Sequence, residues 1–274
     1  MGKIILLNTP IGNLGDLTPR VLGALQEGDT FAVEDTRVFK ELLNHLGISI
    51  NGKKIYSLHD QSESNQIEKL IEVAKSHHLY VASEAGSPIV SDPAYPLIVA
   101  AYDVGIEIES YSGISSPIMA LELSGLPPIP FHFHGFLPRE GAKKSKAWSE
   151  LQYGTHIFFE APTRIEETLD RLSSDAPEFQ VALVRELSKK FQQVERFMAK
   201  DWGVIKQKVT FKGEFVLLVH HSAYQKVSSQ HLKSLAEDIL NHGATPKNLS
   251  KLLSDILDRP TKDIYGELNK FKKS

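Results

Sequence analysis

The sequence predicts an α/β protein with two α/β domains, a ligand-binding cleft between them and a small helical tail at the C-terminus. In the first part of the chain, short apolar segments alternate with amphipathic segments of helical period, which is typical of a parallel, doubly wound sheet. Four loops of small residues follow predicted strands, and the last part of the chain shows only helical periodicity. The predicted parts are 1–114, 115–222 and 223–274.

The composition is that of a soluble globular protein, because 41% of the 274 residues are hydrophobic and 24% are charged. The chain has no cysteine, which excludes disulfides, thiolate nucleophiles and cysteine-ligated zinc. The first apolar stretch, which begins after Lys3, ends at Asn8 and is too short for a signal peptide or a membrane span. We therefore expect a cytoplasmic location and no membrane partner.

The net charge of −3 is unevenly distributed along the chain. Residues 1–138 carry a net charge of −8, residues 139–222 carry +2 and residues 223–274 carry +3. This asymmetry could direct a polyanion to the second half. Variation among solvated surface charges would give the same pattern, so charge alone leaves both interpretations open.

Several boundaries of the expected elements carry clear local signals. Thr18 is a suitable N-cap for a helix with Pro19 at its first position, and Gly47 is a suitable helix stop. Residues 137–146 are interpreted as an exposed basic loop. A helix is expected over 164–172. Strands are expected at 4–8, 30–33, 55–58, 79–82, 106–110, 131–136, 157–159, 181–184 and 215–219.

The tail is expected to be helical throughout. One helix should begin at Ser228 or Ser229 and end at Gly243, and two more should span 245–257 and 261–270. The last two have the length and the short connection of a helix-turn-helix. A plain αα-hairpin has the same sequence pattern, and both interpretations remain open.

The small-residue loops, at 9–13, 84–92, 112–116 and 160–164, are the main functional signal. In open α/β sheets, ligands bind beyond the carboxyl ends of the strands. None of the loops contains a GxGxxG or a P-loop pattern, so the sequence does not predict a pyrophosphate site. A ligand that needs close backbone approach and acidic neighbours, such as a nucleoside with a cationic centre, fits better. The alternative is that these loops are ordinary turns.

Candidate catalytic residues follow the second predicted strand, in the sequence Glu-Asp-Thr-Arg at 34–37. A carboxylate at Asp35 beside the guanidinium of Arg37 can stay charged and position a hydroxyl nucleophile. Asp35 or Thr36 could instead cap the next helix, and both roles are compatible.

Two basic runs in the second half are candidate phosphate contacts. The first contains Arg139, Lys143, Lys144 and Lys146 together with Trp148 as a stacking surface, and the second contains Arg185, Lys189, Lys190, Arg196 and Lys200. Solvated loops are the alternative for each run taken singly. The histidine pairs 77/78, 132/134 and 220/221 lack a third ligand at useful spacing, so no metal site is predicted.

Seven ordered motifs carry a resemblance that covers nearly the whole chain. They are Thr-Pro-Ile-Gly-Asn-Leu-Gly-Asp at 9–16, Glu-Asp-Thr-Arg at 34–37, Ser-Glu-Ala-Gly-Ser-Pro-Ile-Val-Ser-Asp-Pro at 83–93, Gly-Phe-Leu-Pro at 135–138, Glu-Ala-Pro-Thr-Arg at 160–164, Arg-Glu-Leu-Ser-Lys-Lys-Phe at 185–191 and Lys-Gly-Glu-Phe at 212–215. The pattern resembles the ribosomal RNA methyltransferases of the tetrapyrrole methylase superfamily. Glu84, Ser87, Ala94 and Ser112 stand where that family usually has Asp, Thr, Gly and Pro.

The resemblance implies a homodimeric enzyme that uses S-adenosylmethionine to methylate a cytidine 2′-hydroxyl in small-subunit ribosomal RNA or in the assembled small ribosomal subunit. A small-molecule, tetrapyrrole-type methyltransferase that also uses S-adenosylmethionine is the alternative. The implied cofactor contacts are Pro10, Ile11, Gly86, Ser87, Val90, Ser115 and Ser116. Asp35 oriented by Arg37 is the candidate general base, and Glu160 with Arg164 is the alternative. The implied RNA contacts are Arg139, Lys143, Lys144, Arg164 and Lys189.

Overall fold

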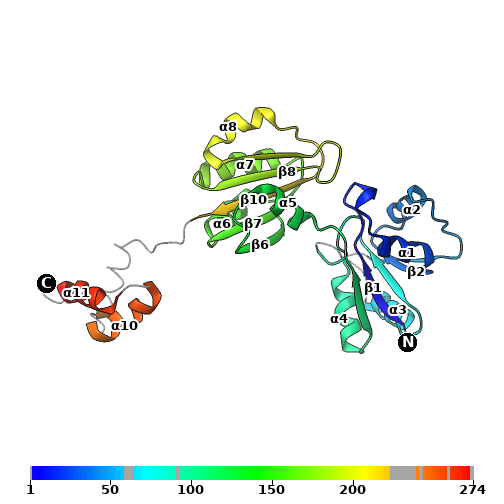
Figure 1. Cartoon of the computed structure of the whole chain (residues 1–274), viewed down its shortest axis with the longest axis horizontal. Coiled ribbons are helices and arrows are strands. Elements are labelled where there is room, and N and C mark those ends of the chain that lie inside the picture. Colours follow the sequence, from blue (N-terminus) through cyan, green and yellow to red (C-terminus); the bar gives the residue numbers. More distant parts are fainter. Residues whose placement is uncertain are drawn as a thin grey trace. The chain divides into compact units, whose positions relative to one another are not determined.

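A computed structural model of the chain describes residues 2–58, 64–90, 93–222, 239–240, 243–257 and 260–271. The chain forms two compact units, Met1–Ser222 and Ala223–Ser274. The first unit contains two five-stranded sheets, and the second contains helices (Figure 1). The predicted boundary between two α/β domains at 114/115 falls within the first unit and stays a prediction.

The first sheet is entirely parallel and has the strand order β3-β2-β4-β1-β5. Since all five strands run the same way, their carboxyl ends lie along one edge. Its strands are β1 (Lys3–Leu7), β2 (Thr30–Val33), β3 (Lys54–Ser57), β4 (Leu79–Ala82) and β5 (Glu107–Tyr111). The connecting helices are η1 (Leu14–Asp16), α1 (Pro19–Glu27), α2 (Thr36–His45), α3 (Ser64–Ser76) and α4 (Tyr95–Asp103).

Helices cover both faces of this sheet. One apolar cluster joins α1 and α2 to one face through Leu25 and Leu43, and another joins α3 and α4 to the opposite face through Leu70 and Leu97. The predicted Thr18 cap is confirmed, since the Thr18 hydroxyl accepts a hydrogen bond from a first-turn amide of α1. The doubly wound arrangement predicted from the alternating pattern is therefore confirmed.

The second sheet is mixed, with the order β6-β7-β10-β8-β9. Only the β6–β7 pair is parallel. Its strands are β6 (Phe131–Phe136), β7 (Gly154–Glu160), β8 (Gln180–Arg185), β9 (Gln193–Met198) and β10 (Phe215–His221). Its helices are α5 (Ser116–Ser124), α6 (Gly141–Ser149), α7 (Ile165–Asp175), η2 (Ala199–Asp201), α8 (Trp202–Ile205) and η3 (Lys206–Lys208).

Two predictions about this half of the chain were wrong. The segment 137–146 is not all loop, because α6 begins at Gly141. The edge strand β9 was missed, because Arg196 was assigned to a basic surface run. Both segments lie at the outside of the fold, where apolar periodicity is weak and gives little signal.

The second unit contains α10 (Pro246–Leu257) and α11 (Thr261–Phe271), which agree closely with the predicted helices 245–257 and 261–270. They pack through Leu249, Ile264 and Leu268. The helix-turn-helix and the αα-hairpin both stay predictions for this pair, and the predicted cap at Ser228 or Ser229 lies outside the described residues. Among the described helices of both units, none has the length and apolar character needed to cross a membrane.

Candidate functional site

The loops that follow β1 and β4 are joined to each other by their backbones. The amide of Thr9 donates to the carbonyl of Gly86 at 2.9 Å, and the amide of Gly86 donates to the carbonyl of Thr9 at 3.0 Å. Gly86 has a φ of +84°, a left-handed conformation that glycine adopts without steric cost. The Ser83 hydroxyl also donates to the Gly86 carbonyl at 2.8 Å. The glycine therefore fixes the β4 loop against the β1 loop.

The loop that follows β5 packs against the same β1 loop. The Asn8 side-chain amide donates to the Tyr111 carbonyl at 2.7 Å. A Cβ on Gly113 would stand only 2.5 Å from the Asn8 Cβ, which is too close for any side chain. Only glycine at this position lets the two loops approach so closely. Three of the four predicted loops thus meet at the carboxyl edge of the first sheet.

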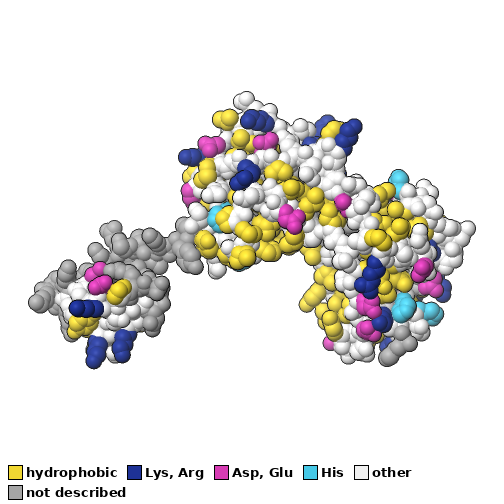
Figure 2. Space-filling model, in the orientation of Figure 1, with side chains coloured by type: hydrophobic (Ala, Val, Ile, Leu, Met, Phe, Trp, Pro, Cys, Tyr) yellow, Lys and Arg dark blue, Asp and Glu magenta, His cyan; other side chains and the backbone are white. Residues whose placement is uncertain are grey.

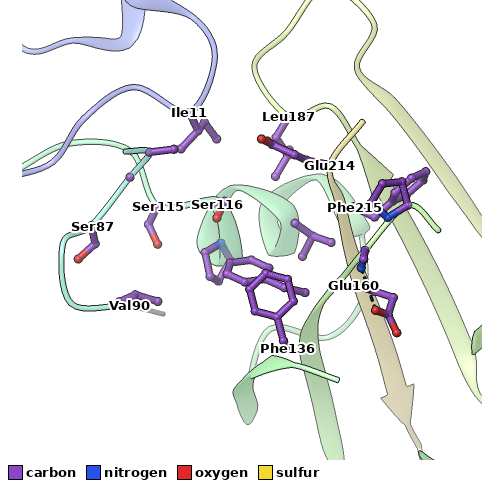
Figure 3. Close-up of a pocket in the computed structure, with 17 residues that line it drawn as sticks. Ile11, Ser87, Val90, Ser115, Ser116, Phe136, Glu160, Leu187, Glu214 and Phe215 are labelled. Atoms are coloured by element: carbon purple, nitrogen blue, oxygen red, sulfur yellow. Dashed lines mark hydrogen bonds between the residues drawn. The ribbon is translucent and has the colours of Figure 1, made fainter. Parts of the chain in front are cut away.

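These loops and the end of β7 enclose a cavity of about 410 Å³ (Figure 3). This volume is in the range of small-molecule sites. Residues 85–87, 115–117 and 160–162 line the cavity together with Ile11 and Val90. The remaining wall is mainly apolar and is formed by Phe136, Phe159, Leu187, Glu214, Phe215 and Val216. The predicted convergence of the four loops on one cleft is confirmed.

The predicted cofactor contacts lie at this cavity with one exception. Six of them line it, namely Ile11, Gly86, Ser87, Val90, Ser115 and Ser116. Pro10 is buried and does not line the cavity. Ser115 is the N-cap residue of α5, but its hydroxyl makes no capping hydrogen bond, so it remains available to a ligand.

Glu160, at the end of β7, is a fully buried carboxylate whose two oxygens are both occupied. Oε1 accepts hydrogen bonds from the Ala161 amide at 2.8 Å (Figure 3) and forms an ion pair with Arg164 at 2.7 Å. Oε2 accepts from the Thr168 hydroxyl at 2.8 Å and lies 3.4 Å from the buried ammonium of Lys144. These four partners take up the acceptor positions of the carboxylate, so neither oxygen is free to contact the hydroxyl of a bound substrate. This geometry disfavours Glu160 as a general base and supports a structural role.

Beside Glu160 in the second sheet, the motifs at 185–191 and 212–215 fold against each other. The Glu186 carboxylate accepts the Glu214 amide at 2.8 Å and the Lys189 ammonium at 3.2 Å, and Lys189 also pairs with the Glu214 carboxylate at 2.9 Å. Burial alone would lower the pKa of Lys189, but the hydrogen bonds to Glu214 and Glu186 outweigh it and raise that pKa. The Lys189 chain also packs over Gly12 in the β1 loop. Lys189 therefore ties the two α/β parts of the first unit together.

Asp35 and Arg37 lie at the same carboxyl edge, at the end of β2, but they do not line the main cavity. The Arg37 guanidinium, followed by the Arg37 amide, donates hydrogen bonds to the Asp35 carboxylate and lowers its pKa to about 2. The hydrogen bond from the Arg37 amide makes Asp35 the N-cap of α2, so the predicted capping role is confirmed. Glu84 lies close by, and its burial, followed by the charges of Glu34 and Asp35, raises its pKa.

The predicted phosphate contacts divide into three groups. Arg139 and Lys143 are exposed. Arg164 and Lys189 are partly buried and engaged with the carboxylates described above. The prediction for Lys144 was wrong, because its side chain is only 1% exposed and lies against Glu160 and Thr168.

Trp148 was also misassigned as a stacking surface, since it is buried and packs edge-on against Phe158. Lys144 and Trp148 are four residues apart in α6, so they share one helix face. This face packs inward. The four-residue spacing of Lys144 and Trp148 is the sequence signal that distinguishes these two residues from their exposed neighbours.

Functional positions that the sequence alone did not single out are the aromatic and aliphatic residues of the cavity wall. Phe136, Leu187 and Phe215 stand within three of the quoted motifs, but only the fold shows that they converge. Leu187 lies between Glu186 and Ser188, which have left-handed φ values of 52° and 63°. A conformation so uncommon for residues other than glycine has no clear sequence signature.

The histidines of β6 and β7 form a hydrogen-bonded chain. The His156 Nε2 lies 2.9 Å from the Gln152 carbonyl and must donate to it, so Nδ1 of neutral His156 accepts from His134 Nε2 at 2.9 Å. His132 stacks on His156 with ring centroids 4.9 Å apart. In the parts of the chain that the structure describes, no group of three or more histidine, aspartate or glutamate side chains is arranged to hold a metal ion.

The hydrogen-bonded histidines should make the stability of the protein depend on pH. Burial, aided by the neighbouring histidines, lowers the pKa of His156 to about 4. Below about pH 6.5, the ordinary pKa of histidine, His156 binds a proton in the unfolded state but not in the folded state. The free energy of unfolding should therefore decrease as the pH falls, until the pH reaches about 4, the pKa of His156 in the folded state. The loss should be up to about 3 kcal/mol. Urea unfolding at several pH values in this range measures the loss. His156→Gln should make the free energy of unfolding less dependent on pH, whereas the same substitution at the exposed His78 should leave the dependence unchanged. An equally steep curve for both variants would contradict this assignment.

Sequence comparisons agree with the motifs. The sequence profile of the tetrapyrrole (corrin/porphyrin) methylases matches residues 3–201, which include the first sheet and every strand of the second sheet except β10. The chain is 34% identical to ribosomal RNA small subunit methyltransferase I of Halalkalibacterium halodurans, over 97% of this chain and 94% of that protein. It is 36% identical to the Vibrio cholerae protein of the same name, over 92% of this chain and 89% of that protein. The resemblance predicted from the motifs is therefore confirmed.

Solved structures share the fold at low sequence identity. A diphthine synthase superposes with a TM-score of 0.58 at 15% identity, over 80% of this chain and 89% of that one. A Thermus thermophilus uroporphyrin-III C-methyl transferase complexed with S-adenyl homocysteine superposes with a TM-score of 0.51 at 16% identity, over 80% and 98%. The matching family profile and the relatives at 34% and 36% identity show that the chain belongs to the tetrapyrrole (corrin/porphyrin) methylase family, together with the two ribosomal RNA methyltransferases named above.

Proposed function

We propose that this protein transfers the methyl group of S-adenosylmethionine to the 2′-hydroxyl of a cytidine in small-subunit ribosomal RNA. The observation that supports this proposal most strongly is the single cavity at which four tight loops meet. The nearly full-length similarity to relatives named for the small-subunit RNA gives the substrate class. We also propose a cytoplasmic location, since that is where this RNA is found.

The residues around the cavity fit such a cofactor. Phe159, Leu187 and Phe215 offer an apolar wall suitable for an adenine ring. The hydroxyls of Ser87, Ser115 and Ser116 offer hydrogen bonds to ribose or amino-acid groups. The α5 N-terminus adds a partial positive charge that suits a carboxylate. Among the described residues, no lysine or arginine lines the cavity, so a sulfonium meets little repulsion there.

The bound cofactor would supply a methyl group on a positively charged sulfur, and that charge disappears as the carbon–sulfur bond breaks and the carbon–oxygen bond forms. The protein therefore has to align two reactants, which can contribute about 7–11 kcal/mol to the lowering of the barrier. The proton released by the 2′-hydroxyl goes to Asp35, which Arg37 holds in orientation. Glu160 is the weaker candidate for this role, because its side chain is completely buried, whereas the Asp35 side chain is 24% exposed.

The RNA backbone would lie along the exposed basic side chains that follow β6. Arg139 and Lys143 are exposed there, and Lys146 extends the same surface at the far end of α6. Lys143 and Lys146 form ion pairs with glutamates within α6, and such exposed pairs cost little to exchange for a phosphate.

We propose a second copy of this chain as the protein partner. Tyr95, Val99 and Tyr102 form an apolar stripe along α4 at helical spacing, and they are 64%, 40% and 70% exposed. A contiguous apolar surface of this kind is typical of an interface. Sedimentation velocity at micromolar concentration tests the proposal, which predicts the mass of a dimer; a monomer would contradict it.

The function is tested by incubating the purified protein with small ribosomal subunits and S-adenosylmethionine, followed by mass mapping of the RNA. One added methyl group on a cytidine ribose, with protection of the adjacent phosphodiester from alkaline cleavage, is the expected result. Methylation of a nucleobase would contradict the 2′-oxygen assignment. Methyl transfer to a tetrapyrrole but not to RNA would favour the small-molecule alternative.

A further inference from the structure

One aromatic side chain that lines the cavity, Phe136, is largely exposed. The residue is 60% exposed, although apolar neighbours surround it in the cavity wall. Hydrophobic side chains gather around the part of the surface where β6 lies, and the exposed Ile129 and Phe131 belong to the same segment (Figures 1 and 2). Figure 3 shows Phe136 across the cavity from Val90.

The backbone holds this ring in place. The β6–β7 ladder shifts register between Phe133 and Phe136, and Gly135 between them has a φ of +69°. Directly after the shift, the Leu137 amide donates to the Phe159 carbonyl at 3.1 Å, and Leu137 is buried. The irregularity therefore places Phe136 at the cavity mouth between two fixed points.

The surrounding rings fix its orientation and leave part of it free. Phe159 packs edge-on against both Phe133 and Phe136, with centroid distances of 5.0 and 5.4 Å. Such edge-on contacts are favourable for aromatic rings. Phe136 therefore has its orientation set by Phe159 while it keeps an exposed surface toward the cavity mouth.

We propose that Phe136 is the stacking surface for the target nucleobase, a subsite that rests on the proposed function. Proteins bind unpaired bases by stacking them on exposed aromatic rings beside cationic groups. Arg139 follows Phe136 by three residues, at most about 10 Å along an extended chain, and Lys143 lies in the next helix. A base on Phe136 would thus have phosphate-binding side chains nearby, while its ribose faces the cavity.

A stacked cofactor adenine is the alternative occupant, and the test separates the two. Phe136→Ala should raise the RNA concentration for half-maximal single-turnover methylation by about 10- to 100-fold, the range expected for one base stack. Phe136→Tyr should retain activity, and Phe136→Leu, which keeps the bulk without the ring, should not. Phe131→Ala is the matched control, because Phe131 is 40% exposed on the same strand but does not line the cavity. Calorimetry should give the same S-adenosylmethionine affinity for all variants.

An RNA fragment that lacks the target base completes the test. The wild type should bind this fragment as weakly as Phe136→Ala binds intact RNA. Phe136→Ala should bind the fragment no more weakly than the wild type does. Three results would each overturn the stacking assignment. They are additive losses of RNA affinity from Phe136→Ala and from removal of the base, wild-type methylation by Phe136→Leu, and a loss of S-adenosylmethionine affinity as large as the loss of RNA affinity. If the wild type itself transfers no methyl group to RNA, the proposed function fails instead.

Discussion

Replacing Asp35 with asparagine should lower the single-turnover rate of methyl transfer on intact small subunits by about 10²- to 10⁴-fold. Asparagine keeps the shape and the helix-capping oxygen of Asp35 but cannot accept the proton of the 2′-hydroxyl. The hydrogen bonds from Arg37 hold the pKa of Asp35 at about 2, so the wild-type carboxylate stays ionised throughout the neutral range. The same low pKa makes Asp35 a weak base, so the loss of rate should lie near the lower limit of about 10²-fold. An unchanged rate would remove Asp35 from the mechanism.

Two controls separate catalysis from folding in this experiment. Asp35→Asn should unfold at the wild-type temperature, whereas Asp35→Ala should lose about 1 kcal/mol because the α2 cap is removed. Cofactor affinity should be unchanged in both, since Asp35 does not line the cavity. Arg37→Gln should lower the rate less than Asp35→Asn, because it removes the orientation of the carboxylate but not the carboxylate itself.

Replacing Glu160 with glutamine should destabilise the protein by about 3–5 kcal/mol, because the buried ammonium of Lys144 would lose its counter-charge. For a domain of this size, the loss corresponds to a fall in melting temperature of about 6–20 °C. Arg164 should contribute less to the loss, since its side chain is 23% exposed and can be solvated. Thermal and urea unfolding measure the effect.

The double variant Glu160→Gln with Lys144→Met provides the matched control. It removes both charges from the interior, so it should be more stable than Glu160→Gln alone. Simple addition of the two single losses would contradict the pairing of these side chains. Wild-type stability of Glu160→Gln would show that the carboxylate is not required to compensate Lys144.

Much of the first sheet could be predicted from the sequence. Its strands are short apolar runs, and helix signals such as Thr18 and Gly47 stand where propensity and capping place them. The convergence of the loops also follows from the parallel order, because parallel strands all end at one edge.

The second half of the site could not be predicted in the same way. Phe136, Leu187 and Glu214 come from strands and loops whose pairing is mixed, and only the long-range register brings them to one wall. The burial of Lys144 depends on the carboxylate of Glu160, which is sixteen positions away and belongs to another element. Counting charges along the chain does not reveal such a pair.

The central claim is that the loops of both sheets form one site for a sulfonium nucleoside, and calorimetric titration of the protein with S-adenosylmethionine tests it most directly. We expect one binding site per chain, little change for Ser87→Ala, and loss of binding for Ser87→Trp, which would place an indole in the cavity. Absence of binding by the wild type, or unchanged binding by Ser87→Trp, would contradict the assignment of this cavity.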